Sequence, residues 1–324
     1  EGVTADGAIS IHKALVNDPE RLLAWHTIFM LMTVAIVIRG VQHGLEKSVR
    51  IIMPALFIII LMLVGYGYNT GEYFHQSVDF LFATDFSKLT HTGVLTAMGH
   101  AFFTLSLGMG AIMVYGSYLP QKASIFKVSL TISVMDTGVA LLAGLAIFPL
   151  VFANGLEPGQ GPSLIFDTLP IAFGHMPGGE FFGGIFFVLL LFAAWSSGIS
   201  LVEPIVVWLV ENKNMTRLRA SVYSGAIIWL LGLLTIFSFN IGREWTLFGL
   251  TMFELLDYLT ANIMLPLGGL LIAFFAGWVM KRQSSMDELE LGNGVLYSTW
   301  RVLVRFITPI AIMIVFANLI GLLN

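Results

Sequence analysis

Three stretches of the sequence carry polar residues that could bind a cation inside otherwise apolar surroundings. The first contains Asp136, in the segment SVMDTGVALLAG, and no basic residue lies close to it along the same stretch. A charge at the centre of a bilayer costs about 2.5 to 3.5 kcal/mol on insertion scales. If this stretch spans a membrane, Asp136 needs a bound cation or a partner on another helix; a protonated, hydrogen-bonded aspartic acid is the alternative.

The second stretch carries small and hydroxyl-bearing residues in the sequence AWSSG. At helical spacing, Ala193, Ser196 and Ser197 share one face. Hydroxyl and carbonyl oxygens are the ligands that hard cations prefer. The same sequence is also typical of close packing between membrane helices. Two interpretations therefore stay open, an alkali-cation site and a packing face.

The third stretch, Phe102–Ala111, has the sequence FFTLSLGMGA and contains Thr104, Ser106 and two glycines. Glycine is conformationally free and hydroxyl side chains compete for backbone hydrogen bonds, so such a segment forms a helix poorly. In hydrocarbon an unpaired backbone group costs several kcal/mol, and backbone unwinds only where it lines a cavity or binds a ligand. The stretch indicates either a broken spanning helix with a ligand at the break or a helix packed closely through its small residues.

Other polar residues have weaker signals. Glu203 precedes Pro204 and could bond backbone groups freed by a helix kink or act in transport. His100 is more typical of a neutral hydrogen-bonded group than of a proton carrier. Glu211 and Asp257 lie near the ends of apolar stretches, either as parts of a salt bridge that closes a pathway or as solvated helix ends. Because the sequence has no cysteine, no HExxH or GxSxG motif and no phosphate loop, it does not predict an enzyme.

The composition places these residues in a membrane. Hydrophobic residues make up 57% of the 324 and charged residues 11%, and the mean hydropathy is +0.86. These values predict an all-α membrane protein. A spanning helix needs about 20 apolar residues, and the stretches that fit are centred near Phe29, Ile58, Leu105, Ala143, Phe192, Trp229, Leu267 and Ile314. We therefore expect about eight transmembrane helices.

Polar segments predict the domain organisation. Residues 1–20 are expected to form an extracellular loop, and residues 21–324 a transmembrane helical domain. The long connections at residues 69–92 and 154–180 are expected to fold over this domain as extracellular caps.

The basic residues predict the orientation. If successive links alternate between the two sides of the membrane, all lysines and arginines fall on one side except Lys13, Arg21, Lys88 and Arg243. Positive residues favour the cytoplasm, so both chain ends are expected on the extracellular or periplasmic side of the cell inner (plasma) membrane. The sequence has no initiator Met and no signal-peptide pattern, so we expect a fragment preceded by an odd number of further spans.

Four segments together resemble the neurotransmitter:sodium symporter family, specifically its bacterial amino-acid transporters of the eleven-helix type. They are FFTLSLGMGAIMVYGSY, DTGVALLAGLAIFP, GPSLIFDTLP (Gly161–Pro170) and SSGISLVEP (Ser196–Pro204). The resemblance extends from about Arg39 to the chain end. It implies a LeuT-like inverted-repeat fold, with the eight stretches matching family helices 4 to 11 and the first three helices absent. Phe102–Ala111 would then be a broken helix.

The resemblance also implies a substrate site. Phe103 would be an aromatic lid over the substrate, and the carbonyls of Phe103 and Thr104 and the Ser106 hydroxyl would bind the substrate ammonium group. The implied walls of the side-chain pocket are Met109, Ser197 and Leu201.

Two sodium sites and two gates follow from the same resemblance. Thr104 and Asp136 would belong to the first sodium site, and each site would be completed by residues missing from this chain. The implied ligands of the second site are Ala193, Ser196 and Ser197. The inner gate would pair Glu211 with Tyr118, and Asp257 would belong to the outer gate.

Two departures from the family pattern predict selectivity. Asp136 replaces a frequent Asn, and Ala140 stands where chloride-dependent members have Ser. Because a fixed carboxylate can supply the negative charge, chloride is predicted not to be required. Met109 replaces a common aromatic residue, and its adaptable thioether favours bulky substrates.

The predicted function is therefore sodium-coupled symport of neutral hydrophobic or aromatic L-amino acids by alternating access. Its partners would be the amino acid and the lipid bilayer, with no nucleic acid. A proton-coupled permease of the same fold and an inactive scaffold fragment are the alternatives.

Overall fold

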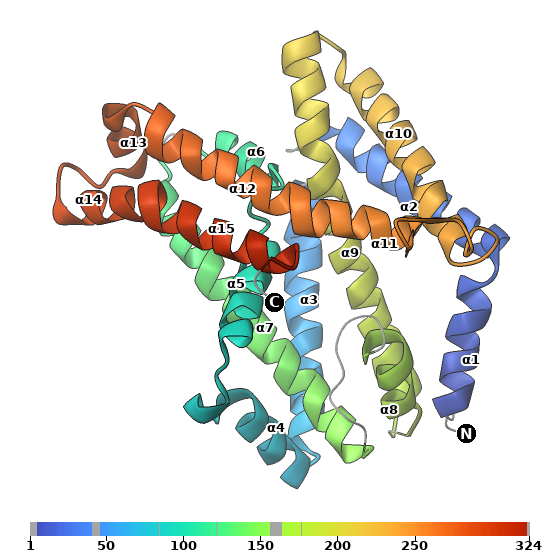
Figure 1. The fold of residues 1–324 in the computed structure, drawn as a ribbon. Helices are drawn as coiled ribbons and strands as arrows, with labels where there is room; N and C mark the ends of the chain where they lie inside the picture. Colours follow the sequence, from blue (N-terminus) through green and yellow to red (C-terminus); the bar gives the residue numbers. More distant parts are fainter. Residues whose placement is uncertain are drawn as a thin grey trace. The chain divides into compact units, whose positions relative to one another are not determined.

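The computed structural model describes residues 5–40, 46–83, 85–120, 122–155, 164–175 and 177–322. Helices account for nearly all of this part of the chain, and seven helical runs in it are long and apolar enough to cross a membrane. The strands found in these ranges, β1 (Thr246–Leu247) and β2 (Leu250–Thr251), form one short two-stranded sheet. The prediction of an all-α membrane protein is confirmed (Figure 1).

The chain forms two compact units. The first comprises residues 1–84 and 138–246, and the second comprises residues 85–137 and 247–324. Helix α7 (Ile125–Ala153) contributes residues to both, since the boundary falls between Thr137 and Gly138. Each unit therefore has its own set of packed helices.

Four long helices form the frame of the first unit. They are α2 (Pro19–Ile38), α3 (Glu46–Tyr68), α9 (Gly179–Lys213) and α10 (Arg217–Ser238). α9 contacts the other three, and α2 packs along α10. A buried cluster joins α2, α9 and α10 through Val37, Ile199, Val206 and Ala220. Burial of this apolar face determines which way the polar residues of α9 can point.

Shorter helices occupy the segments expected as loops. Residues 1–20 include α1 (Ala5–Val16), which their polar composition did not reveal, and residues 69–92 include α4 (Glu72–Phe82). Residues 154–180 include the π-helical turn η3 (Leu164–Thr168) and α8 (Leu169–His175). The first residues of the GPSLIFDTLP segment, 161–163, lie outside the described ranges. Leu169 and Phe173 of α8 enter a core cluster with Leu63 of α3 and Phe186 of α9, so this segment is packed rather than a free linker.

The second unit is built on two long helical runs that include π-helical turns. One run consists of α11 (Met252–Asp257), η4 (Tyr258–Met264), α12 (Leu265–Phe274) and η5 (Phe275–Val279). The other consists of α14 (Val295–Val302), η6 (Leu303–Ile307) and α15 (Thr308–Leu319). The polar helix α13 (Arg282–Leu289) connects them in sequence. α15 packs on both α12 and α5 (His91–Thr104).

The apolar stretch centred near Leu105 is broken into two helices. α5 ends at Thr104, and six residues separate it from the start of α6 (Ala111–Ser117). Between them, Ser106, Gly108 and Gly110 have φ angles of 54°, 85° and 82°. Because these angles belong to the left-handed region, the segment cannot continue a right-handed helix. Of the two interpretations of this stretch, the structure has the broken helix.

The break is held against a pair of glycines in α12. A β-carbon at Gly268 would lie 2.5 Å from the carbonyl oxygen of Gly108, and one at Gly108 would lie 2.8 Å from the amide nitrogen of Gly269. Both distances are shorter than a carbon atom tolerates, so the two backbones meet only because Gly108 and Gly268 lack side chains, while Gly269 makes room for the Phe102 ring. The Gly268–Gly269 pair thereby fixes where the broken segment lies in the second unit.

Replacing Gly268 with alanine should therefore destabilise the protein. The added methyl group would overlap backbone atoms that cannot turn aside, and overpacking of this kind costs about 1 to 3 kcal/mol. The measurement is the melting temperature of the purified protein in detergent. Gly184→Ala in α9 is the control, because nothing lies within 4 Å of the new β-carbon there. Equal melting temperatures for the two variants would contradict this account of the packing.

Candidate functional site

The clearest polar contact in the second unit joins the end of α5 to α7. The Thr104 hydroxyl oxygen Oγ1 donates a hydrogen bond to Asp136 Oδ1, at 3.0 Å, although the two residues are 32 apart in sequence. Asp136 is half-buried, and no ion pair involves it among the described residues. The contact brings together the two residues predicted for a first sodium site.

The electrostatics at this point favour a cation. Thr104 is the last residue of α5, and the final carbonyls of a helix carry the negative end of its dipole. Some of these carbonyls are used locally, since the Phe103 oxygen accepts from the Ser106 amide at 2.9 Å. A carbonyl has two lone pairs, so this bond leaves acceptor capacity. The helix end and the Asp136 carboxylate therefore place negative charge together.

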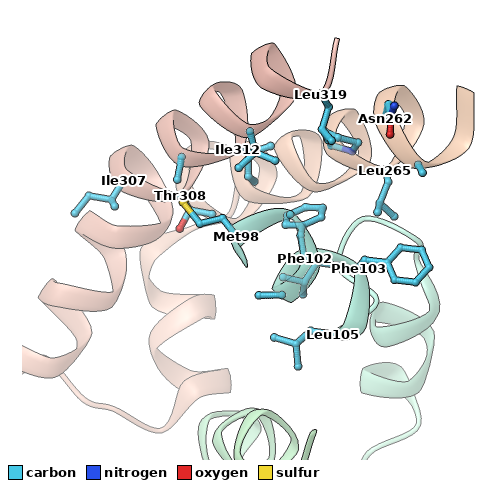
Figure 2. A pocket seen from close by; sticks show the side chains of 17 residues that line it. Met98, Phe102, Phe103, Leu105, Asn262, Leu265, Ile307, Thr308, Ile312 and Leu319 are labelled. Atoms are coloured by element: carbon cyan, nitrogen blue, oxygen red, sulfur yellow. The ribbon is translucent and has the colours of Figure 1, made fainter. Parts of the chain in front are cut away.

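The predicted substrate residues of the second unit lie along the break. Ser106 and Met109 are half-buried. Ser106 is a non-glycine residue in the left-handed region, a conformation that costs free energy and that is found more often at functional sites. Phe103 is 57% exposed, and Figure 2 shows its ring pointing in a different direction from the Phe102 ring, which points towards α12. Phe103 is thus available to cover a bound molecule.

An apolar cavity, which the sequence did not reveal, lies behind the break (Figure 2). Its volume is about 400 Å³, and its walls come from α5, from the run η4–α12 and from the run η6–α15. Phe102 and Leu265 line it, and its few polar side chains include Asn262 and Thr308. Phe103 lines the same cavity, whereas the Phe102 ring also packs against Gly269 of α12.

The predicted second sodium site lies in one turn of α9, in the first unit. The hydroxyls of Ser196 and Ser197 both donate to the Ala193 carbonyl, at 2.9 and 3.1 Å. Three oxygens therefore converge on one face, and each hydroxyl keeps its lone pairs for a cation. The neighbouring Gly198 serves packing, since a β-carbon there would lie 3.2 Å from the Phe29 ring of α2. Both interpretations of the segment thus have a residue that supports them.

The remaining predicted residues are divided between the units. Leu201 and Glu211 belong to the first unit with the Ala193 group, and both are exposed. Tyr118 and Asp257 belong to the second unit with Thr104. Neither Glu211 nor Asp257 forms an ion pair with another described residue. The gates therefore remain predictions.

The first unit contains a buried ion pair that the sequence analysis missed. Glu203 is only 2% exposed, and both its carboxylate oxygens accept from Arg217 Nη2, at 2.8 and 2.6 Å. Arg217 Nε also donates to the Val37 carbonyl at 2.8 Å. The pair joins α9, α10 and the end of α2, so Glu203 is held by a cation rather than by kinked backbone alone. No local pattern links residues 203 and 217, and only the packing of the helices brings them together.

Comparisons with known proteins identify the family of this chain. Residues 8–323 match the family model described as the sodium:neurotransmitter symporter family. The chain is 37% identical to an uncharacterized sodium-dependent transporter of Bacillus subtilis (strain 168), YhdH, in an alignment that covers 99% of the chain and 74% of YhdH. It is 33% identical to an uncharacterized sodium-dependent transporter of Haemophilus influenzae, over 93% of the chain and 66% of that protein.

A solved structure with the same arrangement of helices is the crystal structure of MhsT in complex with L-phenylalanine. Its TM-score against this chain is 0.87 at 38% sequence identity. The match covers 98% of this chain and 72% of MhsT. The similarity thus extends over both units.

Removing the positive partner of Glu203 should cost more stability than any nearby surface change. Arg217→Gln would leave a carboxylate buried without its cation, a change worth about 3 to 5 kcal/mol. The readout is thermal unfolding of the purified protein. Arg219→Gln, two residues along the same helix at an exposed position, is the matched control. The double variant Glu203→Gln, Arg217→Gln should recover part of the loss; a melting temperature of Arg217→Gln equal to that of the control would refute the role.

Proposed function

The chain belongs to the sodium:neurotransmitter symporter family, and we propose that it acts in sodium-coupled import of neutral hydrophobic or aromatic L-amino acids by alternating access. Family membership confirms the resemblance found in the sequence, and the similarity to MhsT confirms the LeuT-like fold. The family is one of transporters rather than enzymes. The observation that carries the proposal for this chain is the contact between Thr104 and Asp136 at the open end of α5.

The proposed ion sites use oxygens that the structure already groups. Thr104 and Asp136 supply a hydroxyl and a carboxylate to the first site, next to the negative end of α5. Ala193, Ser196 and Ser197 supply one carbonyl and two hydroxyls to the second. Each site would need further ligands. A sodium ion that moves down a potential of 100 mV releases about 2.3 kcal/mol, which is the driving force that coupling would use.

The residues of the proposed substrate site are those that the family resemblance implies. Ser106 and the carbonyls at the end of α5 would hold the ammonium group, because acceptors with partial negative charge are concentrated there. Phe103 would cover the substrate, and its exposed ring supports that role. We assign the walls of the side-chain pocket to Met109, Ser197 and Leu201. The MhsT complex contains L-phenylalanine, which supports an aromatic substrate for this chain.

Gating and orientation complete the proposal. Tyr118 and Glu211 would form the inner gate and Asp257 part of the outer gate. Both chain ends would lie on the periplasmic side of the inner membrane, and residues 69–92 and 154–180 would cap that side. The positions of the basic residues support this orientation.

Sodium-driven uptake of phenylalanine into proteoliposomes tests the function directly. An inward sodium gradient should drive uptake, and excess unlabelled glycine should compete poorly. Asp136→Ala should weaken the apparent sodium affinity by about tenfold or more, the usual effect of removing a charged ligand. Asp85→Ala, at an exposed position, should behave as wild type. Uptake that follows a proton gradient without sodium would support the proton-coupled permease instead, and no uptake under any gradient would support a scaffold.

Uptake should not require chloride. The Asp136 carboxylate already supplies a negative charge beside the proposed sodium ion, and Ala140, one turn further along α7, offers no hydroxyl to an anion. The measurement is the initial rate of sodium-driven uptake with chloride replaced by gluconate on both sides of the membrane. We expect the two rates to agree. A large fall on removal of chloride would show that the carboxylate does not replace the anion.

A further inference from the structure

A basic cavity in the second unit is lined by none of the residues assigned to transport. The cavity measures about 220 Å³ and is lined by Arg282 at the start of α13, by Arg301 and Ser298 in α14, and by Arg305 in η6. α13 separates the two candidate spans Met252–Val279 and Val295–Leu319. The cavity therefore lies where these helices leave the apolar part of the membrane.

A buried tyrosine holds two of the arginines in place. Tyr297 is fully buried, and its hydroxyl oxygen accepts from Arg301 Nη1 at 2.7 Å. The same hydroxyl contacts Ser285 Oγ at 2.7 Å and donates to the Arg282 carbonyl at 3.2 Å. Arg282 Nη2 donates to Asn293 Oδ1 at 2.7 Å. Both guanidinium groups are thus oriented by hydrogen bonds to neutral partners, which leave their charge uncompensated.

The third arginine, Arg305, has an N–H donor that no acceptor pairs with in the described part of the chain. The Arg305 guanidinium lies over the Trp278 ring, 3.9 Å from its centroid, and the Trp278 indole donates to the Arg305 carbonyl at 3.2 Å. Arg305 Nε is buried and has no hydrogen-bond partner in the described part of the chain. A buried donor left unpaired costs free energy. Arg305 also lines the cavity, and a planar guanidinium is the group that suits the oxygens of a phosphate best.

The acidic residues nearby do not neutralise this group. Arg282, Arg301 and Arg305 form no ion pair with any described carboxylate. Asp287, in the same helix as Arg282, instead accepts from Gln283 at 2.8 Å. Three positive charges without a carboxylate partner therefore line one small cavity, and a bound anion would compensate them.

An apolar groove adjoins the basic cavity, so an anion that carries an apolar chain would fit both. The groove, of about 570 Å³, shares Ser298 and Val302 with the cavity and continues past Leu303 and Ile307. We propose that the cavity binds the phosphate group of an anionic phospholipid, with an acyl chain in the groove. Basic pockets between membrane helices bind acidic headgroups by this combination of charge and apolar contact. The site is independent of which amino acid is transported.

The test measures lipid binding to the purified transporter by native mass spectrometry, with thermal stability as a second readout. Dioleoyl phosphatidylglycerol is the probe, dioleoyl phosphatidylcholine the neutral lipid, and inorganic phosphate the free anion. We expect phosphatidylglycerol to bind and to raise the melting temperature, whereas the other two do neither. Loss of one charged hydrogen bond weakens binding about tenfold, so Arg301→Gln and Arg305→Gln should each show a loss of that size.

The controls separate the site from general charge attraction and from misfolding. Lys281→Gln removes an equal charge from an exposed neighbour that does not line the cavity, and it should keep wild-type binding. Arg301→Lys keeps the positive charge but loses the planar guanidinium with its several N–H donors. This variant should bind phosphatidylglycerol more weakly than wild type and should keep the wild-type melting temperature in phosphatidylcholine. Equal losses in Lys281→Gln and Arg301→Gln, unchanged binding in both arginine variants, or an equal effect of inorganic phosphate would overturn the proposal.

Discussion

Backbone hydrogen bonding in hydrocarbon is the constraint on which the rest of this structure depends. The stretch Phe102–Ala111 leaves the helix where unpaired backbone groups are most costly, and it does so against Gly268, whose missing side chain lets the backbone of Gly108 approach α12. The left-handed backbone at Ser106, Gly108 and Gly110 ends the helix before this contact. Because α5 ends at Thr104, its hydroxyl meets Asp136 and its last carbonyls add negative charge at the same point.

Two acids of the described helices that are buried or half-buried, Glu203 and Asp136, have different neighbours. Glu203 is paired with Arg217, which also bonds the end of α2, so its charge is used to hold three helices together. Asp136 accepts a hydrogen bond from the neutral Thr104 hydroxyl and forms no ion pair with a described residue. The proposed sodium ion would compensate its charge, in line with the expectation for acids at this depth. The arginines of the basic cavity present the opposite case, positive charge that an anion would compensate.

Features that depend on neighbours along the chain were predictable. Apolar length and composition identified the spans, and the glycines and hydroxyls near Ser106 indicated the break, because φ preference and hydrogen-bond competition are properties of a few consecutive residues. The family resemblance added the pairing of Thr104 with Asp136, which no local pattern contains. By contrast, helix α1 was missed because residues 1–20 contain no apolar run of spanning length, and the apolar cavity behind Phe102 was missed because its walls come from three separate helical runs.

By itself, the sequence determined that this chain is a helical membrane protein with oxygen-bearing residues in its apolar stretches, and it left Phe102–Ala111 as either a broken or a closely packed helix. Only the tertiary structure decided which of those residues have partners. Arg217 reaches Glu203 across a helix interface, and Tyr297 of α14 meets Ser285 of α13. Such contacts depend on helix packing, in which side-chain shape selects one arrangement among many. Charge at a single position can be identified in the sequence, but its compensation is a property of the fold.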